Sequence, residues 1–174
     1  MGSAILRPVR RLAPLLVFVA LIGCGSDDDE PAPSVNQSAA PPMFLDGGRD
    51  AFEKRIASER GTPVVVNKWA SWCGPCRFEF PFFQSQEKKR DGKVVFLGVN
   101  SNDNQGDAEE FLADYPVDFP HFKDPNLEIA ASFNAVQAFP ATAFYDSKGQ
   151  LAYVHQGGYS KESALAADID RYAR

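Results

Sequence analysis

The sequence predicts an α/β domain with a central mixed β-sheet flanked by helices, spanning about residues 48–174. The first observation behind this prediction is that short apolar runs alternate with segments whose apolar residues recur at helical spacing. Strands that are separated by helices pair in parallel. The second observation is a pair of strands near the C-terminus, joined by the Gly-containing loop 147–150, which adds an antiparallel edge to the sheet.

Helices and strands alternate in the first part of this domain, and Gly or Pro marks most of their ends. Apolar residues at helical spacing predict the helices, and short β-branched or aromatic runs predict the strands. In chain order these elements are a helix over 49–59, a strand over 63–68, a helix over 73–90, a strand over 93–99, a helix over 106–115 and a short helix over 126–133.

The last part of the domain consists of two strands and a final helix. The strands are expected over 141–146 and 151–155, on either side of the hairpin loop. The helix is expected over 160–172, with Ser160 as its N-cap. Three of its residues are predicted to face inward: Leu165, Ile169 and Tyr172.

The charge and the cysteine count exclude some function classes. The chain has 174 residues and a formal net charge of −5. Residues 1–23 contain three arginines and no acids, so the remainder holds 15 basic against 23 acidic residues, a balance of −8. An acidic domain without a basic cluster is a poor nucleic-acid binder. Three cysteines are an odd number, so at least one is unpaired or modified.

The N-terminus has the pattern of a lipoprotein export signal. A short basic segment precedes the apolar run 12–23, whose 12 residues are too few to span a bilayer, which takes about 20. The run ends Leu-Ile-Gly before Cys24, which resembles the bacterial lipobox. We therefore expect a signal peptide over 1–23 and a lipidated Cys24 at the membrane surface. The alternative is a soluble secreted protein in which Cys24 is unmodified.

The segment between Cys24 and the domain is predicted to be a disordered tether over 24–47. It contains four consecutive acidic residues at 27–30, followed by several prolines among small and polar residues. A composition of this kind offers nothing from which a core could form.

The run 72–76, Trp-Cys-Gly-Pro-Cys, carries the chemistry. A cysteine at the start of a helix meets free N–H groups and the positive end of the helix dipole, which lower its pKa below the usual ~8.5 and favour the thiolate. Pro75 needs no N–H in that first turn. Two other interpretations are a structural disulfide and half of a zinc site. So short a loop gains little stability from a bridge, and zinc would need two more ligands, for which only His121 and His155 are candidates.

These residues resemble a known family. The run 69–76 reads Trp-Ala-Ser-Trp-Cys-Gly-Pro-Cys, which looks like the signature of the thioredoxin superfamily. The continuation 77–81, Arg-Phe-Glu-Phe-Pro, resembles the exported TlpA/ResA branch. The resemblance extends over 48–174. It implies a thioredoxin-like three-layer sandwich, a nucleophilic Cys73 and a resolving Cys76 that form a redox disulfide.

The resemblance also implies that Pro140 is the cis-proline of the loop that faces the disulfide. The backbone of Phe139 would then pair with an extended substrate strand beside Cys73. We assign the neighbours of the disulfide to substrate binding, namely Trp72, Gly74, Pro75 and Phe139. An ordinary trans-proline at the start of a strand is the alternative for Pro140.

Two positions depart from the cytoplasmic thioredoxin pattern. Asn67 stands where those proteins have a buried acid, as in the exported branch, and Lys68 stands where the family often has an aromatic residue. Glu79, three residues after Cys76 on the same helix, is the candidate to take the proton of Cys76 in place of the missing acid. A solvent-exposed Glu79 without a function is the alternative. We expect Lys68 to extend its charged end to the surface.

These observations predict a membrane-anchored, extracytoplasmic thiol–disulfide oxidoreductase. The resemblance suggests that it reduces disulfides of exported proteins, such as apocytochrome c in cytochrome c maturation or metal-assembly factors. A membrane electron donor would re-reduce it, because the sequence has no flavin or nicotinamide motif. We expect a monomer with neither cofactor nor metal.

Two alternatives share the fold. A Sco-like copper chaperone would use Cys-x-x-x-Cys and a histidine, and this chain has one residue fewer between its cysteines. A thiol peroxidase would have Thr three residues before its reactive cysteine, where this chain has Ala70.

Overall fold

The structure is a computed structural model that describes residues 44–174. The predicted signal peptide, the lipidated Cys24 and the tether as far as residue 43 lie outside the described residues. Within the described range, no helix is both long enough and apolar enough to cross a membrane.

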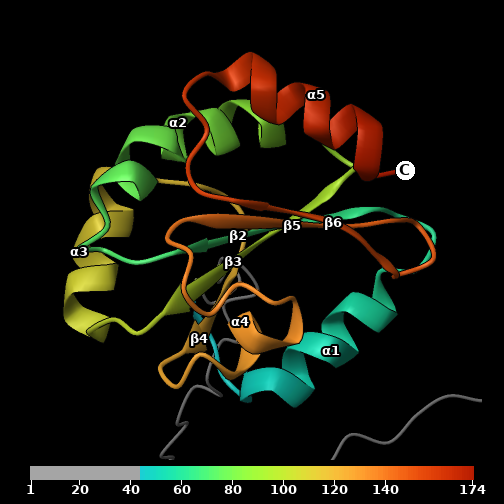
Figure 1. The fold of residues 1–174 in the computed structure, drawn as a ribbon. Coiled ribbons are helices and arrows are strands. Elements are labelled where there is room, and N and C mark those ends of the chain that lie inside the picture. The colour runs from blue at the N-terminus through green and yellow to red at the C-terminus, as the bar shows by residue number, and fades with distance from the viewer. Residues whose placement is uncertain (1–43) are drawn as a thin grey trace, which may run out of the picture. The chain divides into compact units, whose positions relative to one another are not determined.

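A six-stranded mixed sheet forms the centre of the fold (Figure 1). Its strands are β1 (Phe44–Leu45), β2 (Val64–Trp69), β3 (Val95–Ser101), β4 (His121–Asp124), β5 (Ala141–Tyr145) and β6 (Leu151–Gln156). Their spatial order is β1-β4-β3-β2-β5-β6. The first four strands in this order pair in parallel, whereas β5 is antiparallel to both β2 and β6. The predicted mixed sheet is confirmed, including its antiparallel edge.

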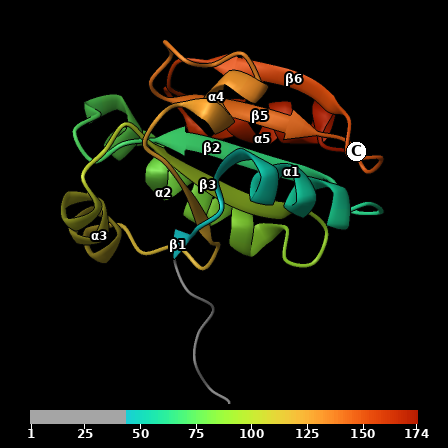
Figure 2. The ribbon, with the colours of Figure 1, turned by 90° about the horizontal axis from the view of Figure 1, so that it is seen from below.

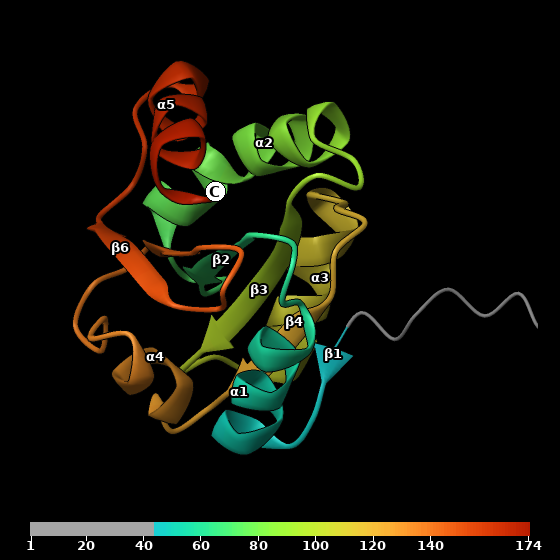
Figure 3. The same cartoon turned by 90° about the vertical axis from the view of Figure 1, so that its right-hand side faces the viewer.

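Five helices cover the two faces of the sheet. They are α1 (Gly48–Ser58), α2 (Gly74–Lys89), α3 (Gln105–Asp114), α4 (Glu128–Ser132) and α5 (Glu162–Tyr172). One hydrophobic cluster joins one face of the sheet to α2, α3 and α5, and a second joins the other face to α1 and α4. Figures 2 and 3 show the same layers from two further directions, with α1 and α4 on the side opposite α2 and α5. This arrangement is the thioredoxin-like three-layer sandwich that the resemblance implied.

Strand β2 lies inside the sheet and is buried over its whole length. Successive side chains of a strand point to opposite faces. Accordingly Val65 and Trp69 belong to the cluster under α2 and α5, while Val64 and Val66 belong to the cluster under α1 and α4. The same alternation directs Asn67 to the α2 face and Lys68 to the α4 face, so both polar side chains must find partners inside the protein.

Most predicted element ends differ from the observed ones by one or two residues, and two assignments at the ends of the domain are wrong. Residues 44–45, assigned to the tether, form strand β1, which pairs with β4 through Phe44 opposite His121. A strand of two residues is too short to produce a hydrophobic pattern in the sequence. The N-cap of α5 is Lys161 rather than Ser160, and its side chain makes no capping hydrogen bond.

Close packing between β3 and β4 holds His121 against Trp69 in the core. Trp69 Nε1–H donates to Nδ1 of the buried His121, 3.0 Å away. Burial lowers the pKa of His121 to about 3, so the ring is neutral and can accept this bond. Gly98 pairs with His121 in the sheet, and a Cβ at Gly98 would overlap the imidazole ring. Gly98 is thus required by close packing.

Gly98→Ala is expected to lower the free energy of unfolding by about 2–4 kcal/mol, because the added methyl group displaces His121 and breaks its bond to Trp69. Urea unfolding of the oxidised protein measures this change. Gly106→Ala, at an exposed position of α3 where the added Cβ would lie 3.3 Å from the Asn104 side chain, is the control and should change the free energy of unfolding by less than about 1 kcal/mol. If Gly98→Ala were as stable as the control, the packing argument would be wrong.

Candidate active site

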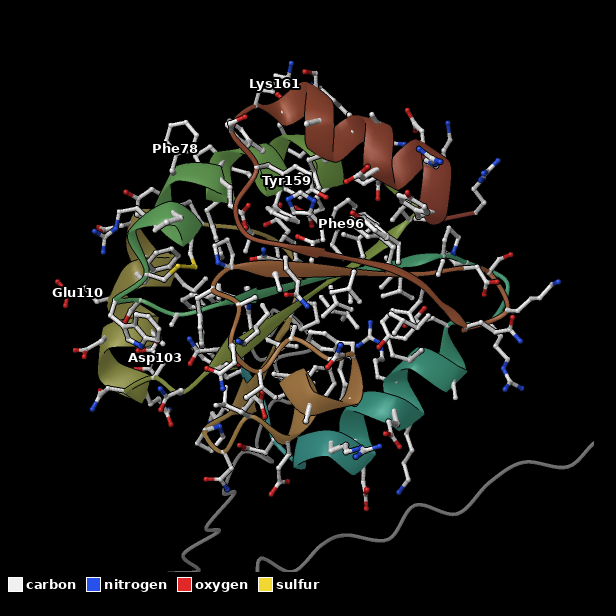
Figure 4. The ribbon with its side chains drawn as sticks, in the orientation of Figure 1. Phe78, Phe96, Asp103, Glu110, Tyr159 and Lys161 are labelled. Carbon is white, nitrogen blue, oxygen red and sulfur yellow. A yellow bond between two sulfur atoms is a disulfide. The ribbon has the colours of Figure 1, made fainter. Side chains whose placement is uncertain are left out.

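The disulfide joins Cys73 and Cys76 at the start of α2, where Figure 4 shows it as a yellow bond. Cys73 is the N-cap of this helix, and its Sγ accepts the backbone N–H of Cys76 at 3.2 Å. The helix therefore directs a free N–H at the sulfur that would carry the thiolate charge in the dithiol form. Pro75 occupies the first turn, as predicted.

Both cysteines are buried in the disulfide form. Only 3% of Cys73 is exposed and Cys76 is completely buried, whereas Trp72 beside them is 56% exposed. In the disulfide form the Cys73 sulfur is bonded to Cys76 and lies over the first helical turn, so Trp72 is the more exposed residue at the site.

The segment before the disulfide is held by the loop that follows β3. The N–H and the hydroxyl of Ser71 donate to the two carboxylate oxygens of Asp103, at 2.6 and 2.7 Å. Trp72 Nε1–H donates to the carbonyl oxygen of Asn102 at 2.9 Å. These bonds position the chain that leads from β2 into α2, and the position of Asp103 is visible in Figure 4.

The sheet register brings the Pro140 loop to the disulfide. Because β5 runs antiparallel to β2, its first residue Ala141 pairs with Lys68 at the end of β2. The Phe139–Pro140 peptide bond is cis, as the resemblance implied, and the Phe139 ring lies 4.6 Å from the ring of Trp72. A Cβ on Gly158 would lie 3.5 Å from the side chains of both Pro75 and Pro140.

Glu79 is buried under the disulfide end of α2. It is 0% exposed, which contradicts the alternative of a solvent-exposed Glu79. Its Oε1 accepts from Asn67 Nδ2 and its Oε2 accepts from the N–H of Tyr159, each at 2.9 Å. Burial raises the pKa of Glu79 to about 7, although both hydrogen bonds oppose the rise. A carboxyl with this pKa can take up and release a proton near neutral pH.

Asn67 can serve both protonation states of Glu79. Its Nδ2 donates to the carboxylate, while its Oδ1 is buried without a hydrogen-bond partner. An amide carries a donor at one end and an acceptor at the other. Rotation of the amide would therefore present Oδ1 to a protonated Glu79. Asn67 occupies the position at which cytoplasmic thioredoxins have a buried acid. The structure places it in hydrogen-bond contact with Glu79.

Lys68 is completely buried, so the expectation that it reaches the surface is wrong. Its ammonium group contacts the loop that precedes Pro140. The physical reason is that α4 and this loop cover the face of β2 on which Lys68 lies, and its side chain has no path to solvent.

Tyr159 is a site residue that the sequence did not identify. Its N–H donates to Glu79, its hydroxyl donates to Asp168 at 2.7 Å, and its ring stacks on that of His155 with the ring centroids 4.1 Å apart. Figure 4 labels Tyr159 between the sheet and α5. The turn at Gly157 and Gly158 was the only local signal that the chain returns to the site here. Among residues 44–174, no three His, Cys, Asp or Glu side chains gather as metal ligands.

Comparison with known proteins gives consistent results. The Redoxin family model matches residues 27–169. The chain is 30% identical over 172 residues to the thiol-disulfide oxidoreductase ResA of Geobacillus kaustophilus, covering 95% of this chain and 94% of that protein.

Two solved structures share the fold. One is the dsbF protein of MTB in mixed oxidized and reduced forms, with 30% identity and a TM-score of 0.60, covering 66% of this chain and 83% of that one. The other is a secreted Mycobacterium tuberculosis disulfide oxidoreductase homologous to E. coli DsbE, with 25% identity and a TM-score of 0.59, covering 66% and 85%. The chain therefore belongs to the Redoxin family and is a thiol–disulfide oxidoreductase of thioredoxin-like fold.

Proposed function

We propose that this oxidoreductase is tethered to a membrane on its extracytoplasmic side and reduces disulfides of exported proteins, such as apocytochrome c or metal-assembly factors. The observation that carries the proposal is the redox disulfide at the N-terminus of α2, beside the exposed Trp72 and the Phe139–Pro140 loop. An exposed aromatic side chain and a loop backbone suit a polypeptide substrate.

The reaction exchanges one disulfide for another. In the dithiol form, the Cys73 thiolate attacks a substrate disulfide, and a mixed disulfide forms while the first substrate thiolate leaves. Cys76, as a thiolate, then attacks Cys73 Sγ, which releases the second substrate thiolate and leaves the Cys73–Cys76 disulfide. Two electrons pass from the protein to the substrate, and a dithiol electron donor in the membrane returns them.

Glu79 acts in the second step of this scheme. Cys76 must lose its proton before it attacks, and it is completely buried away from solvent. Glu79 follows Cys76 by three residues on α2, and helical side chains three apart share a face. With its pKa near 7, Glu79 can accept this proton and pass it on after release of the substrate.

The extracytoplasmic location is supported by the sequence of the N-terminus and by one relative. The apolar run before Cys24 has the length of a signal peptide. The similar Mycobacterium tuberculosis oxidoreductase is described as secreted. The lipid at Cys24 would hold the domain close to a membrane electron donor.

Neither alternative function has a better case. A copper chaperone needs a histidine beside its cysteines, and His121 is instead buried and bound to Trp69. A peroxidase needs Thr at the position of Ala70, which is buried and has no hydroxyl.

Trapping tests the substrate class. Cys76→Ser should accumulate mixed disulfides between Cys73 and exported proteins, because the resolving thiol is absent. Affinity purification from envelope extracts, followed by mass spectrometry of the released proteins, identifies them. Cys73→Ser is the matched control and should trap far less. Adducts confined to cytoplasmic proteins, or equal trapping by the control, would contradict the proposal.

Glu79→Gln should slow release of the mixed disulfide roughly 10- to 100-fold at pH 8, a modest general-base effect because thiols ionise readily. The wild-type rate should rise with pH through about 7, where Glu79 becomes ionised, and the variant should lack this rise. Stopped-flow reduction of a protein disulfide from pH 5 to 9 gives both profiles. Glu87→Gln, on the same helix, is the control. Overlapping profiles for Glu79→Gln and wild type would exclude the role.

Cys24→Ser should remove the lipid and leave the protein largely out of the membrane fraction, because the apolar run 12–23 is too short to span a bilayer and anchor the chain in place of the lipid. Metabolic labelling with palmitate and cell fractionation measure both effects. Ser26→Ala should behave like wild type. Full membrane recovery of Cys24→Ser with unchanged mobility would show that Cys24 is not the anchor.

A further inference from the structure

Lys68 is buried against the loop 135–140, which ends at the cis-proline, and it has no part in the reaction scheme above. Lys68 is 0% exposed, on the face of β2 that is covered by α1 and α4. Burying an ammonium group is unfavourable unless all its donors are satisfied. The burial lowers the pKa of Lys68 to about 8, while the charge of Asp124 at the end of β4 acts in the opposite direction.

Every donor of this ammonium group is used on one short segment. Nζ donates to the carbonyl oxygens of Ala135 at 2.8 Å, Val136 at 3.2 Å and Ala138 at 2.8 Å. An ammonium group has three donors, so this loop takes all of them. The segment lies between α4 and β5 and belongs to no helix or strand, so Lys68 replaces the hydrogen bonds that regular structure would supply.

The same ammonium group holds the aromatic ring at the end of this loop. Nζ lies 3.3 Å from the centroid of the Phe139 ring, the geometry of a cation–π contact in a site without solvent. The Phe139 ring in turn lies 4.6 Å from the ring of Trp72. A continuous series of contacts therefore runs from the buried charge to the exposed aromatic residue beside the disulfide.

We propose that Lys68 is a positioning residue for polypeptide substrates: it fixes the loop 135–140 and the Phe139 ring in the conformation that an extended substrate segment meets beside Cys73. The inference rests on the proposed function. It restricts the favoured substrate to a disulfide within a polypeptide, since only such a substrate reaches both the disulfide and the loop. A small disulfide needs only Cys73.

The test compares two substrates of one pre-reduced enzyme. One is a peptide of about ten residues that contains a disulfide, and the other is hydroxyethyl disulfide. Lys68→Met keeps the length and the apolar stem but removes the charge and the donors. The ratio of the second-order rate constants, peptide over small disulfide, should fall about tenfold. The fall should come from a higher half-saturating peptide concentration, with little change in the limiting rate.

Two further variants separate positioning from simple loss of stability. Leu97→Ala removes a fully buried side chain of β3, outside the loop 135–140, from the cluster on the same face of the sheet, and it should keep the wild-type ratio at a similar or larger loss of stability. Lys68→Arg retains a cation with donors and should recover most of the ratio. It also provides the comparison if Lys68→Met is too unstable to assay.

The proposal would be overturned by an unchanged ratio in Lys68→Met, by an equal fall for both substrates, or by the same fall in Leu97→Ala. Each of these leaves the proposed function intact, because wild type still reduces the peptide. Failure of wild type itself to reduce the peptide, with hydroxyethyl disulfide still reduced, would overturn the proposed function and the role of Lys68 together.

Discussion

The burial of two polar side chains at the end of β2 is the constraint on which the site depends. Asn67 and Lys68 lie inside a strand covered on both faces, and each must find its hydrogen bonds within the protein. Asn67 finds Glu79 on one side, and Lys68 finds the loop before Pro140 on the other. Strand β2 thus joins α2, which carries the disulfide, to the loop before Pro140.

The two faces of β2 support different parts of the site. On the α2 side, a backbone N–H of the first helical turn binds Cys73 Sγ, and Glu79, whose pKa burial raises to about 7, follows Cys76 by three residues on the same helix. On the α4 side, a fixed ammonium group orders a segment that has no regular secondary structure. In the proposed function, the first arrangement serves the chemistry and the second serves recognition of a polypeptide substrate.

Membership in the Redoxin family accounts for the disulfide and the fold, but not for every residue beside them. The disulfide and the cis peptide bond agree with what the resemblance implied. Lys68 stands where the family often has an aromatic residue. Here its ammonium group donates hydrogen bonds to three carbonyl oxygens and contacts the Phe139 ring. A charged residue thereby occupies a core position.

The sequence by itself determined four of the six strands, the helix that begins at the cysteines and the chemistry of Cys73 and Cys76, because periodicity, glycines and the Cys-Gly-Pro-Cys run are local signals. It could not determine the exposure of Glu79 and Lys68, or that Tyr159 reaches the site. A helical glutamate and a lysine in a strand are solvent-exposed unless some other segment covers them. Only the tertiary structure brought residues 135–140 and 157–159 over these positions, through pairings distant in the chain, and burial then fixed their partners and protonation.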